Sequence, residues 1–435
     1  MSTPRSKPTV LLAATDRWYP TARLGMALAE TGCTVDAVCP SGHPLRLTHA
    51  TRQIHRYNGL VPLYSFSRAI RKTNPDLVIP ADDLATRHLH DLYRQQSLRG
   101  IAGREICDLI ERSLGPATSF DVVTARNAFM RLAAEEEVRV PHSEVIASIS
   151  TLHDWIARMG FPIVLKANGT SGGDGVRIIN TIERAEQALR KLQAPPLLAR
   201  AAKHAVIDRD FTLLRPSLSR CRPVISAQSF VAGREATSTF FCWQGKVLAS
   251  LHFEVLQKID ATRHATVIRR TEHAEMSDAA EKISRRLNLS GFYGLDFMIE
   301  SKTGHAYLIE INPRTTQVGH LALGKGQDLP AALYAALTAT VLPAGPCVTE
   351  NDTIALFPQE WKRDPASPFL MTAYHDVPWQ APAMVSACAI AVQKQDINRG
   401  RKAVEVDAAS DRTKPQMPAT AKTKSGQVLA QQNEI

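Results

Sequence analysis

The segment Gly291–Arg314 reads GFYGLDFMIESKTGHAYLIEINPR and contains the most informative pattern in the chain. Two runs of alternating or apolar residues, Tyr293–Glu300 and Ala306–Ile311, flank a short polar stretch at 301–304. Ser, Lys, Thr and Gly in that stretch are typical of a tight turn between strands. The segment therefore predicts an antiparallel β-hairpin centred on Thr303.

Three oxygen-bearing side chains converge at one end of this predicted hairpin. Pairing about Thr303 places Asp296 opposite Glu310, and alternation along a strand puts Asn312 on the same face as Glu310. Mg²⁺ prefers a few carboxylate or amide oxygens together with the phosphates of a nucleotide. The three side chains therefore predict a Mg²⁺ site, beside which Arg314 can place a fixed positive charge.

Composition limits the class of protein. The chain has 435 residues, which suggests two or three domains at about 150 residues each. Its net charge of +10 suits an enzyme that binds ATP and an anionic substrate. Because no Lys/Arg cluster is interleaved with aromatic residues, we expect no nucleic-acid partner.

Cysteine usage and hydropathy predict the cellular compartment of the protein. The seven cysteines are scattered and form no C-x-x-C pair, which is typical of reduced thiols in a cytoplasm. The apolar run near the N-terminus is too short for a signal peptide. The most apolar long stretch, Leu329–Leu342, is too short for a membrane span. We therefore expect a cytoplasmic protein with no membrane partner.

The N-terminal part shows alternating strand and helix patterns. Apolar strands are predicted at Thr9–Ala14, Thr34–Cys39 and Leu77–Pro80, with helices at Thr21–Glu30 and Ser65–Lys72 between them. Such alternation predicts a small parallel α/β domain. The loop after its first strand lacks G-x-G-x-x-G, so a dinucleotide site is not indicated.

Two adjacent carboxylates follow the third of these strands. Asp82 and Asp83 lie where α/β folds place their ligands. They are equally suited to cap the next helix. Both interpretations stay open at the level of sequence.

A glycine-rich segment lies at 161–179 and reads FPIVLKANGTSGGDGVRII. Strands are predicted at Phe161–Ala167 and Val176–Ile179, with the loop Asn168–Gly175 between them. Glycine-rich loops can present successive backbone N–H groups to phosphates, and Lys166 can meet a phosphate as a point charge. A simple hairpin turn is the alternative interpretation. The segment is not a Walker P-loop, because no G-K-[ST] opens a helix.

Further elements connect these two segments. A helix is predicted at Val122–Glu136, and strands at Ala236–Trp243 and Lys246–Phe253 form a second hairpin. A helix over Ser277–Leu289, with Ser277 as its N-cap, leads into the hairpin that carries the three oxygen donors.

The order of these features resembles the ATP-grasp superfamily. It comprises a Lys before a glycine-rich loop, a strand ending in a turn and a Glu, and a hairpin with Asp, Glu and Asn followed by Pro-Arg. The sequence is most similar to the ATP-binding half of the carbamoyl-phosphate synthetase large chain. D-alanine–D-alanine ligase and biotin carboxylase are more distant. LIEINPR at 308–314 is the most specific stretch, and GTSGGDGV at 169–176 is moderately specific.

The resemblance implies an α/β fold of several parts. We expect an N-terminal parallel α/β domain at 1–115 and a two-lobed ATP-grasp domain at 116–342. A C-terminal appendage at 343–397 and a disordered tail at 398–435 follow.

The resemblance also implies residues that hold the nucleoside. Phe230 and Val231 fall at the hinge that grips adenine through its backbone. Glu235 matches the carboxylate that holds the ribose hydroxyls. Gln228 occupies a position where relatives often have Glu.

Other positions match residues that contact the phosphates and the metal. Lys166 matches the basic residue on the phosphates, and Gly172 and Gly173 match the loop glycines. Arg126 falls where the carbamoyl-phosphate type has a phosphate-contacting Arg, and Arg314 matches the arginine that steadies the transferred phosphoryl group. Asp296, Glu310 and Asn312 match the metal ligands.

The expected function is that of an ATP-dependent carboxylate–amine (or thiol) ligase, which forms an acyl-phosphate and releases ADP and phosphate. Its cofactors would be ATP and Mg²⁺, or Mn²⁺ in its place, and its partners a small carboxylate and an amine. The resemblance allows a homodimer, because dimers are common in the family, but nothing in this sequence predicts one. Phosphorylation of bicarbonate, as in carbamoyl-phosphate synthetase or a carboxylase, is one alternative. A nucleotide-binding regulatory protein with a decayed site is the other.

Overall fold

The computed structural model describes residues 7–167, 175–194, 223–260, 264–340 and 347–392. Gly172, Gly173 and the predicted tail lie outside the described residues. Backbone contacts divide the chain into two compact units, residues 1–386 and 387–435.

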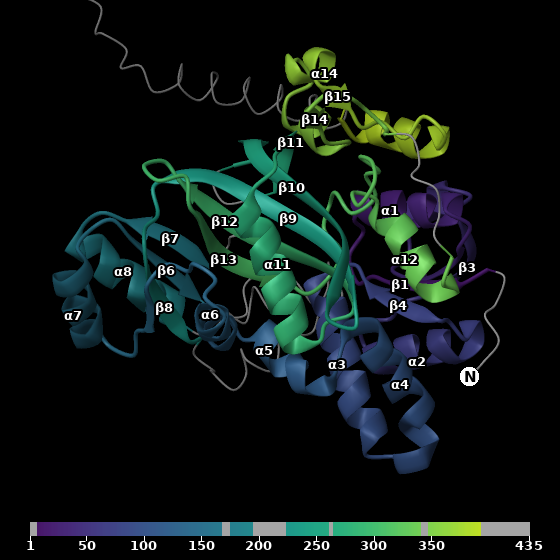
Figure 1. Ribbon diagram of the computed structural model, residues 1–435, viewed down its shortest axis with the longest axis horizontal. Helices are drawn as coiled ribbons and strands as arrows, with labels where there is room; N and C mark the ends of the chain where they lie inside the picture. Colours follow the sequence, from purple (N-terminus) through teal and green to yellow (C-terminus); the bar gives the residue numbers. More distant parts are fainter. Residues whose placement is uncertain (1–6, 168–174, 195–222, 261–263, 341–346, 393–435) are drawn as a thin grey trace, which may run out of the picture. The chain divides into compact units, whose positions relative to one another are not determined.

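The first sheet has four parallel strands in the order β3-β2-β1-β4. Its strands are β1 (Thr9–Ala13), β2 (Thr34–Cys39), β3 (Thr51–Arg56) and β4 (Leu77–Pro80). Its helices are α1 (Tyr19–Glu30), α2 (Pro62–Thr73), α3 (Asp83–Ser97) and α4 (Arg104–Leu114), with short 3₁₀ turns at Pro44–Leu47 and Gly100–Gly103. Figure 1 shows these elements. The predicted parallel α/β domain is confirmed. The edge strand β3 was not predicted, because its polar sequence TRQIHR lacks an apolar run.

The second sheet has seven strands in the order β13-β12-β9-β10-β11-β14-β15. Its members are β9 (Gly233–Trp243), β10 (Lys246–Lys258), β11 (Ala265–Arg270), β12 (Gly291–Glu300), β13 (Ala306–Asn312), β14 (Thr353–Ala355) and β15 (Tyr374–His375). The helix α11 (Ala274–Leu287) lies against β9 and β10 in Figure 1. It buries Met276, Ala280 and Ile283 in a cluster with Phe240 and Leu295.

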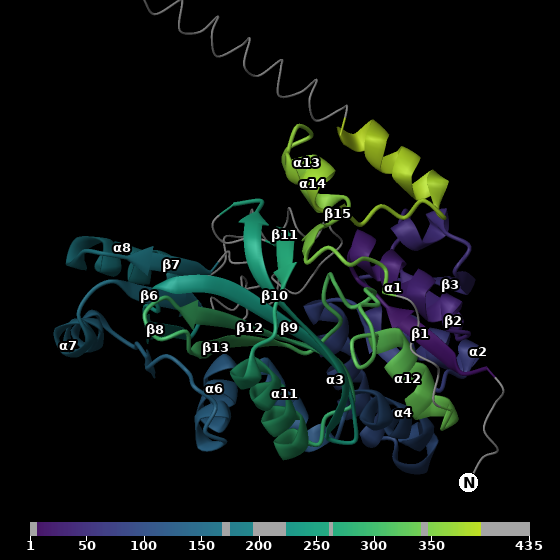
Figure 2. The same ribbon diagram turned by 45° about the horizontal axis from the view of Figure 1, so that its top comes forward.

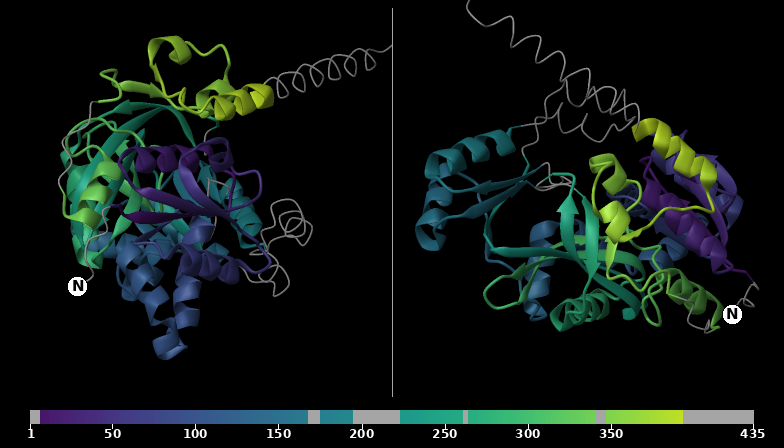
Figure 3. Two further views of the ribbon diagram at one scale, coloured as in Figure 1. Left: turned by 90° about the vertical axis from the view of Figure 1, so that its right-hand side faces the viewer. Right: turned by 90° about the horizontal axis from the view of Figure 1, so that it is seen from above.

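The third sheet has four antiparallel strands in the order β5-β8-β6-β7. These are β5 (Ser143–Val145), β6 (Ile163–Ala167), β7 (Val176–Ile179) and β8 (Ile225–Ser229). Two helices, α7 (Ile149–Met159) and α8 (Ile182–Gln193), pack against it, as Figure 2 shows. In the right-hand view of Figure 3 this sheet stands apart from the seven-stranded sheet. The chain thus has two separate β lobes, and each is stabilised by its own hydrophobic core.

Two predicted helices differ from those observed. The structure breaks Val122–Glu136 into α5 (Phe120–Thr124), preceded by a 3₁₀ turn at Ala117–Ser119, and α6 (Arg126–Glu135). The break lies at Ala125, which is extended. The helix predicted from Ser277 begins one turn earlier, with His273 rather than Ser277 at the N-cap position.

The C-terminal part of the first unit joins the larger sheet. The helix α12 (Leu329–Thr338) packs beside α1, and both belong to one core with strands of the first and second sheets. Beyond it, β14 pairs with β11, and the short helices α13 (Gln359–Arg363) and α14 (Phe369–Thr372) follow. Within the described ranges, no helix combines the length and the apolar character needed to cross a membrane.

Candidate functional site

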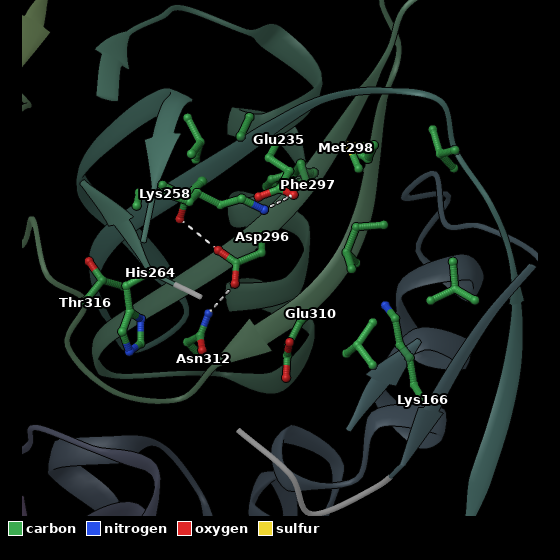
Figure 4. Close-up of a pocket in the computed structure, with 18 of the residues that line it drawn as sticks. Lys166, Glu235, Lys258, His264, Asp296, Phe297, Met298, Glu310, Asn312 and Thr316 are labelled. Carbon is green, nitrogen blue, oxygen red and sulfur yellow. Dashed lines mark hydrogen bonds and ion pairs between the residues drawn. The ribbon is translucent and has the colours of Figure 1, made fainter. Parts of the chain in front are cut away.

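A cavity of about 340 Å³ lies between the two β lobes and is lined from both. Val164, Lys166 and Ile178 line it from the four-stranded sheet, while Met298 and Ile309 line it from the seven-stranded sheet. In Figure 4, Lys166 stands on one side of the cavity, facing Asp296, Glu310 and Asn312 on the other. The cavity therefore contains charged groups of both signs on facing walls.

The three predicted oxygen donors lie together at one end of the hairpin. Asp296 and Glu310 are cross-strand partners, as pairing about Thr303 predicts. The Asn312 Nδ2 donates to Asp296 Oδ2 at 2.9 Å, and the Thr237 hydroxyl donates to Asp296 Oδ1 at 2.9 Å. These hydrogen bonds hold the Asp296 carboxylate towards Asn312.

The electrostatics of this cluster fit a divalent cation. Burial raises the pKa of Asp296, and the neighbouring charge of Glu310 raises it further, against the hydrogen bonds from Asn312 and Thr237. A cation between the two carboxylates would relieve that repulsion. Among the described residues no three His, Cys, Asp or Glu side chains gather to hold a metal. A cation here would therefore also need the Asn312 amide oxygen and phosphate oxygens, an all-oxygen set that suits Mg²⁺.

Two basic side chains face the carboxylates. Lys166, the last but one residue of β6, is only 6% exposed, and burial together with the charge of Arg126 lowers its pKa to about 8. The Arg126 Nη2 donates to Glu310 Oε1 at 2.8 Å, and its Nη1 donates to the Ala167 carbonyl at 3.4 Å. Arg126, the first residue of α6, thus connects the two lobes.

Arg314 is held from several sides. Its Nε donates to Asp83 Oδ1 at 2.9 Å, its Nη2 to Asn312 Oδ1 at 3.1 Å and its Nη1 to the Thr315 carbonyl at 3.1 Å. The guanidinium carbon lies 5.8 Å from the ring centre of Trp18. Because a guanidinium has five N–H donors, two remain for a phosphate or carboxylate.

The other end of the cavity is more apolar. The strand end 228–231, which includes the predicted Gln228, Phe230 and Val231, lines it. Glu235, predicted to hold ribose, pairs with Lys258 at 2.6 Å, as Figure 4 shows. Every predicted site residue that the structure describes therefore lines this one cavity.

The lining residues that the sequence did not reveal include Trp18, Lys258 and His264. Lys258 reaches Glu235 only through the pairing of β9 with β10, which no local motif specifies. Trp18 follows a buried parallel strand, and that position was the available signal for a ligand-facing loop.

The two carboxylates after β4 have different roles. Asp82 caps α3, since its Oδ1 accepts from the Ala85 N–H at 2.8 Å, and it also binds Thr15. Asp83 reaches the cavity and Arg314. The sequence left a helix-capping and a ligand-facing interpretation open for both residues. Asp82 caps the helix, and Asp83 has the position that could face a ligand.

Comparison with known proteins finds similarity over the part of the chain that carries most of this site. Residues 129–318 match the family model described as the ATP-grasp domain. The carbamoyl phosphate synthase large chains of two Thermus thermophilus strains are each 23% identical over 297 residues, which cover 61% of this chain. The match covers 27% of those relatives, so the chain spans about a quarter of their length.

Solved structures share the fold at low sequence identity. The N5-carboxyaminoimidazole synthetase of Staphylococcus aureus, complexed with ADP, has a TM-score of 0.52 at 14% identity, covering 77% of this chain and 78% of that one. The L-amino acid ligase of Bacillus licheniformis gives 0.51 at 14% identity, covering 77% and 75%. The biotin carboxylase domain of Hydrogenobacter thermophilus 2-oxoglutarate carboxylase gives 0.54 at 13% identity, covering 77% and 70%. Residues 129–318 of this chain thus match the ATP-grasp domain model, and its two β lobes lie around one charged cavity.

Proposed function

We propose that this protein is an ATP-dependent ligase that joins a small carboxylic acid to an amine or thiol through an acyl-phosphate. One observation carries the proposal. A single cavity gathers the cations of Lys166, Arg126 and Arg314 around the oxygen donors Asp296, Glu310 and Asn312. Phosphoryl transfer depends mainly on such positioning and charge stabilisation.

The nucleoside would lie at the apolar end of the cavity. Val164, Ile178 and Met298 offer apolar walls for adenine, and the backbone at 230–231 offers hydrogen-bonding groups for its edge. Glu235 would accept from the ribose hydroxyls. Its partner Lys258 holds that carboxylate in place at 2.6 Å.

The triphosphate would extend towards the charged end. Lys166 and Arg126 would contact its phosphates, and the two remaining N–H groups of Arg314 would contact the transferred group. A carboxylate oxygen of the acid attacks the γ-phosphorus, and ADP leaves. The nitrogen of the amine then attacks the acyl carbon, and phosphate leaves.

Asp296, Glu310 and Asn312 would hold the divalent cation. When bound, Mg²⁺ supplies positive charge that offsets the phosphate oxygens. Arg126, which now neutralises Glu310 at 2.8 Å, would then have donors available for a phosphate.

An ADP-release screen tests this function. Purified protein with MgATP is supplied with a panel of carboxylic acids, each with and without hydroxylamine to trap an acyl-phosphate as a hydroxamate. We expect one class of acid to give ADP and hydroxamate together. If no acid in a broad amino-acid and keto-acid panel gave ADP release or hydroxamate, while ATP still bound, the result would count against ligation.

Phosphorylation of bicarbonate is the second candidate. Two similarities support this candidate. The chain resembles carbamoyl phosphate synthase large chains, and one structural neighbour was solved in complex with bicarbonate. Bicarbonate-dependent ADP release without an organic acid would identify this activity. A decayed, binding-only site would give neither response.

A further inference from the structure

The first domain contributes an acidic side chain to the phosphoryl-transfer end of the cavity. Asp83 is the first residue of α3, and it lines the cavity together with Trp18 from the loop before α1. The backbone around it is fixed to the loop after β13, because the Thr86 hydroxyl donates to the Pro313 carbonyl at 2.8 Å. The hydrogen bond between Thr86 and Pro313 therefore helps to hold Asp83 beside Arg314, in addition to the bond that Asp83 itself accepts.

One of the two carboxylate oxygens of Asp83 is available to accept a hydrogen bond from a ligand. Its Oδ1 accepts from Arg314 Nε at 2.9 Å. In the part of the chain that the structure describes, no hydrogen bond reaches Oδ2, and the side chain is 34% exposed. Asp82, its neighbour, is fully engaged in capping and in binding Thr15.

The other acids of the described cavity wall already have roles. Glu235 pairs with Lys258, while Asp296 and Glu310 form the proposed cation site. Asp83 is the remaining carboxylate, and it lies next to the arginine proposed to steady the acyl-phosphate. The other charged groups that face this end, Lys166, Arg126 and Arg314, would repel an ammonium ion.

We propose that Asp83 binds the ammonium group of the amine substrate through Oδ2 and receives its proton before attack. This inference rests on the proposed function and assigns its second substrate to a cationic amine rather than a thiol. The indole of Trp18, next to Arg314, forms the neighbouring wall of this subsite.

The proton balance of the step is simple. The ammonium gives one proton to Asp83, and the free amine nitrogen forms a bond to the acyl carbon. The bond from that carbon to the phosphate oxygen breaks, and the second nitrogen proton goes to the leaving phosphate. Asp83 returns the first proton to water through its exposed side.

Asp83→Asn separates this role from positioning of Arg314. The amide oxygen still accepts from Arg314 Nε, but the charge that attracts an ammonium is lost. With the acid found in the screen, amide formation is measured with a panel of methylamine, glycinamide and phenethylamine. Hydroxamate formation is measured with hydroxylamine, which is uncharged at neutral pH. We expect amide formation to fall about tenfold more than hydroxamate formation, through a raised KM for the amine.

Two further variants control the experiment. Asp91→Asn removes a carboxylate from the exposed face of the same helix, away from the cavity lining, so it should leave the amide-to-hydroxamate ratio unchanged. Asp83→Glu keeps the charge and should recover much of the amine KM. Equal losses of amide and hydroxamate in Asp83→Asn would assign Asp83 to positioning of Arg314 alone and overturn the inference.

A binding measurement makes the outcome independent of turnover. Titration calorimetry of the MgADP complex with the same three amines should show binding to wild-type protein and to Asp91→Asn, and at least tenfold weaker binding to Asp83→Asn. Wild-type protein that binds none of the amines would refute the subsite. Absence of any hydroxamate with intact amine binding would instead refute the proposed function.

Discussion

Lys166 is a buried cation, and within the described residues no carboxylate forms an ion pair with it. Burial and the charge of Arg126 lower its pKa to about 8. Its neutral form therefore becomes common only slightly above physiological pH. A bound phosphate would favour the charged form, so nucleotide affinity and the ionisation of Lys166 are linked.

This linkage predicts a pH dependence of nucleotide binding. Affinity for MgADP should be constant below about pH 7.5 and should fall as pH rises through the pKa of about 8, since the free protein loses the proton that binding requires. The measurement is titration calorimetry between pH 7 and 9.5. Lys166→Arg, which stays charged, should show a flat profile. A flat profile in the wild type would contradict the assignment of Lys166 to the phosphates.

Glu310 offers a second test at the residue scale. Glu310→Gln keeps the size of the side chain and one oxygen but removes the charge opposite Asp296. We expect turnover to fall by about a hundredfold or more, as for other losses of charge stabilisation. Nucleotide affinity should change only a few-fold, because most of the contacts proposed for the nucleotide lie elsewhere in the cavity. Turnover near the wild-type level would refute the metal assignment.

At the scale of elements, the β12–β13 hairpin sets the geometry of the site. Gly294 pairs with Asn312 across the two strands. A Cβ added at Gly294 would meet the Thr316 methyl at 2.5 Å and the Asn312 Cβ at 3.4 Å. The absence of a side chain at Gly294 thus lets Asn312 and Thr316 approach the strand.

Gly294→Ala should therefore displace these two residues. We expect the free energy of unfolding to fall by about 1–3 kcal/mol, as overpacking typically costs, together with at least a tenfold loss of turnover. Gly304→Ala, in the turn of the same hairpin, has φ +75 and open space around it. It should lose about 1–2 kcal/mol of stability with unchanged turnover. Urea unfolding and ADP release distinguish the two, and equal losses of activity would contradict the account.

The predictable elements were those specified by local pattern. The hairpin has its own turn and period-two alternation, so its strands and the pairing of Asp296 with Glu310 could be predicted from residues 291–314. The register shift between Asp296 and Phe297 could not. The single helix predicted at 122–136 failed, because Ala125 is extended and Arg126 begins a new helix that directs its side chain to Glu310. A contact 184 residues away in sequence outweighs the local helical pattern.

The site was predictable for a related reason. The predicted metal donors lie on one hairpin, and Lys166 lies next to a recognisable glycine-rich stretch of sequence. Trp18 and Asp83 each follow a parallel strand, which is a general signal for a ligand-facing position. That they and Lys258 line this particular cavity depends on sheet pairing and domain contacts, which no local signal specifies. The roles of Asp82 and Asp83 could be separated only by their contacts.

At the scale of the first unit, a buried charge cluster joins three distant parts of the chain. Arg23 of α1 forms an ion pair with Asp376, which follows β15, and His320 Nε2 lies 2.7 Å from the other oxygen of Asp376. Arg23 is 8% and Asp376 1% exposed. Burial opposes ionisation of Asp376, but the charges and hydrogen bonds of His320 and Arg23 prevail and lower its pKa.

Breaking this cluster should destabilise the fold. Asp376→Asn leaves the Arg23 guanidinium buried without a charged partner, which typically costs about 3–5 kcal/mol. Replacing the pair together, as Arg23→Met with Asp376→Leu, should recover most of that loss because no buried charge remains. Urea unfolding measures both variants. A loss below about 1 kcal/mol in Asp376→Asn, the range of exposed ion pairs, would contradict a joining role.

The central claim is that Asp296, Glu310 and Asn312 bind a divalent cation against the phosphates of a nucleotide. Anomalous diffraction from crystals grown with Mn²⁺ and a non-hydrolysable ATP analogue tests it most directly. The account predicts a manganese peak contacting oxygens of Asp296, Glu310 and Asn312, with the triphosphate between that peak and Lys166. A manganese peak elsewhere, or a nucleotide bound in this cavity without any peak at these three residues, would contradict it.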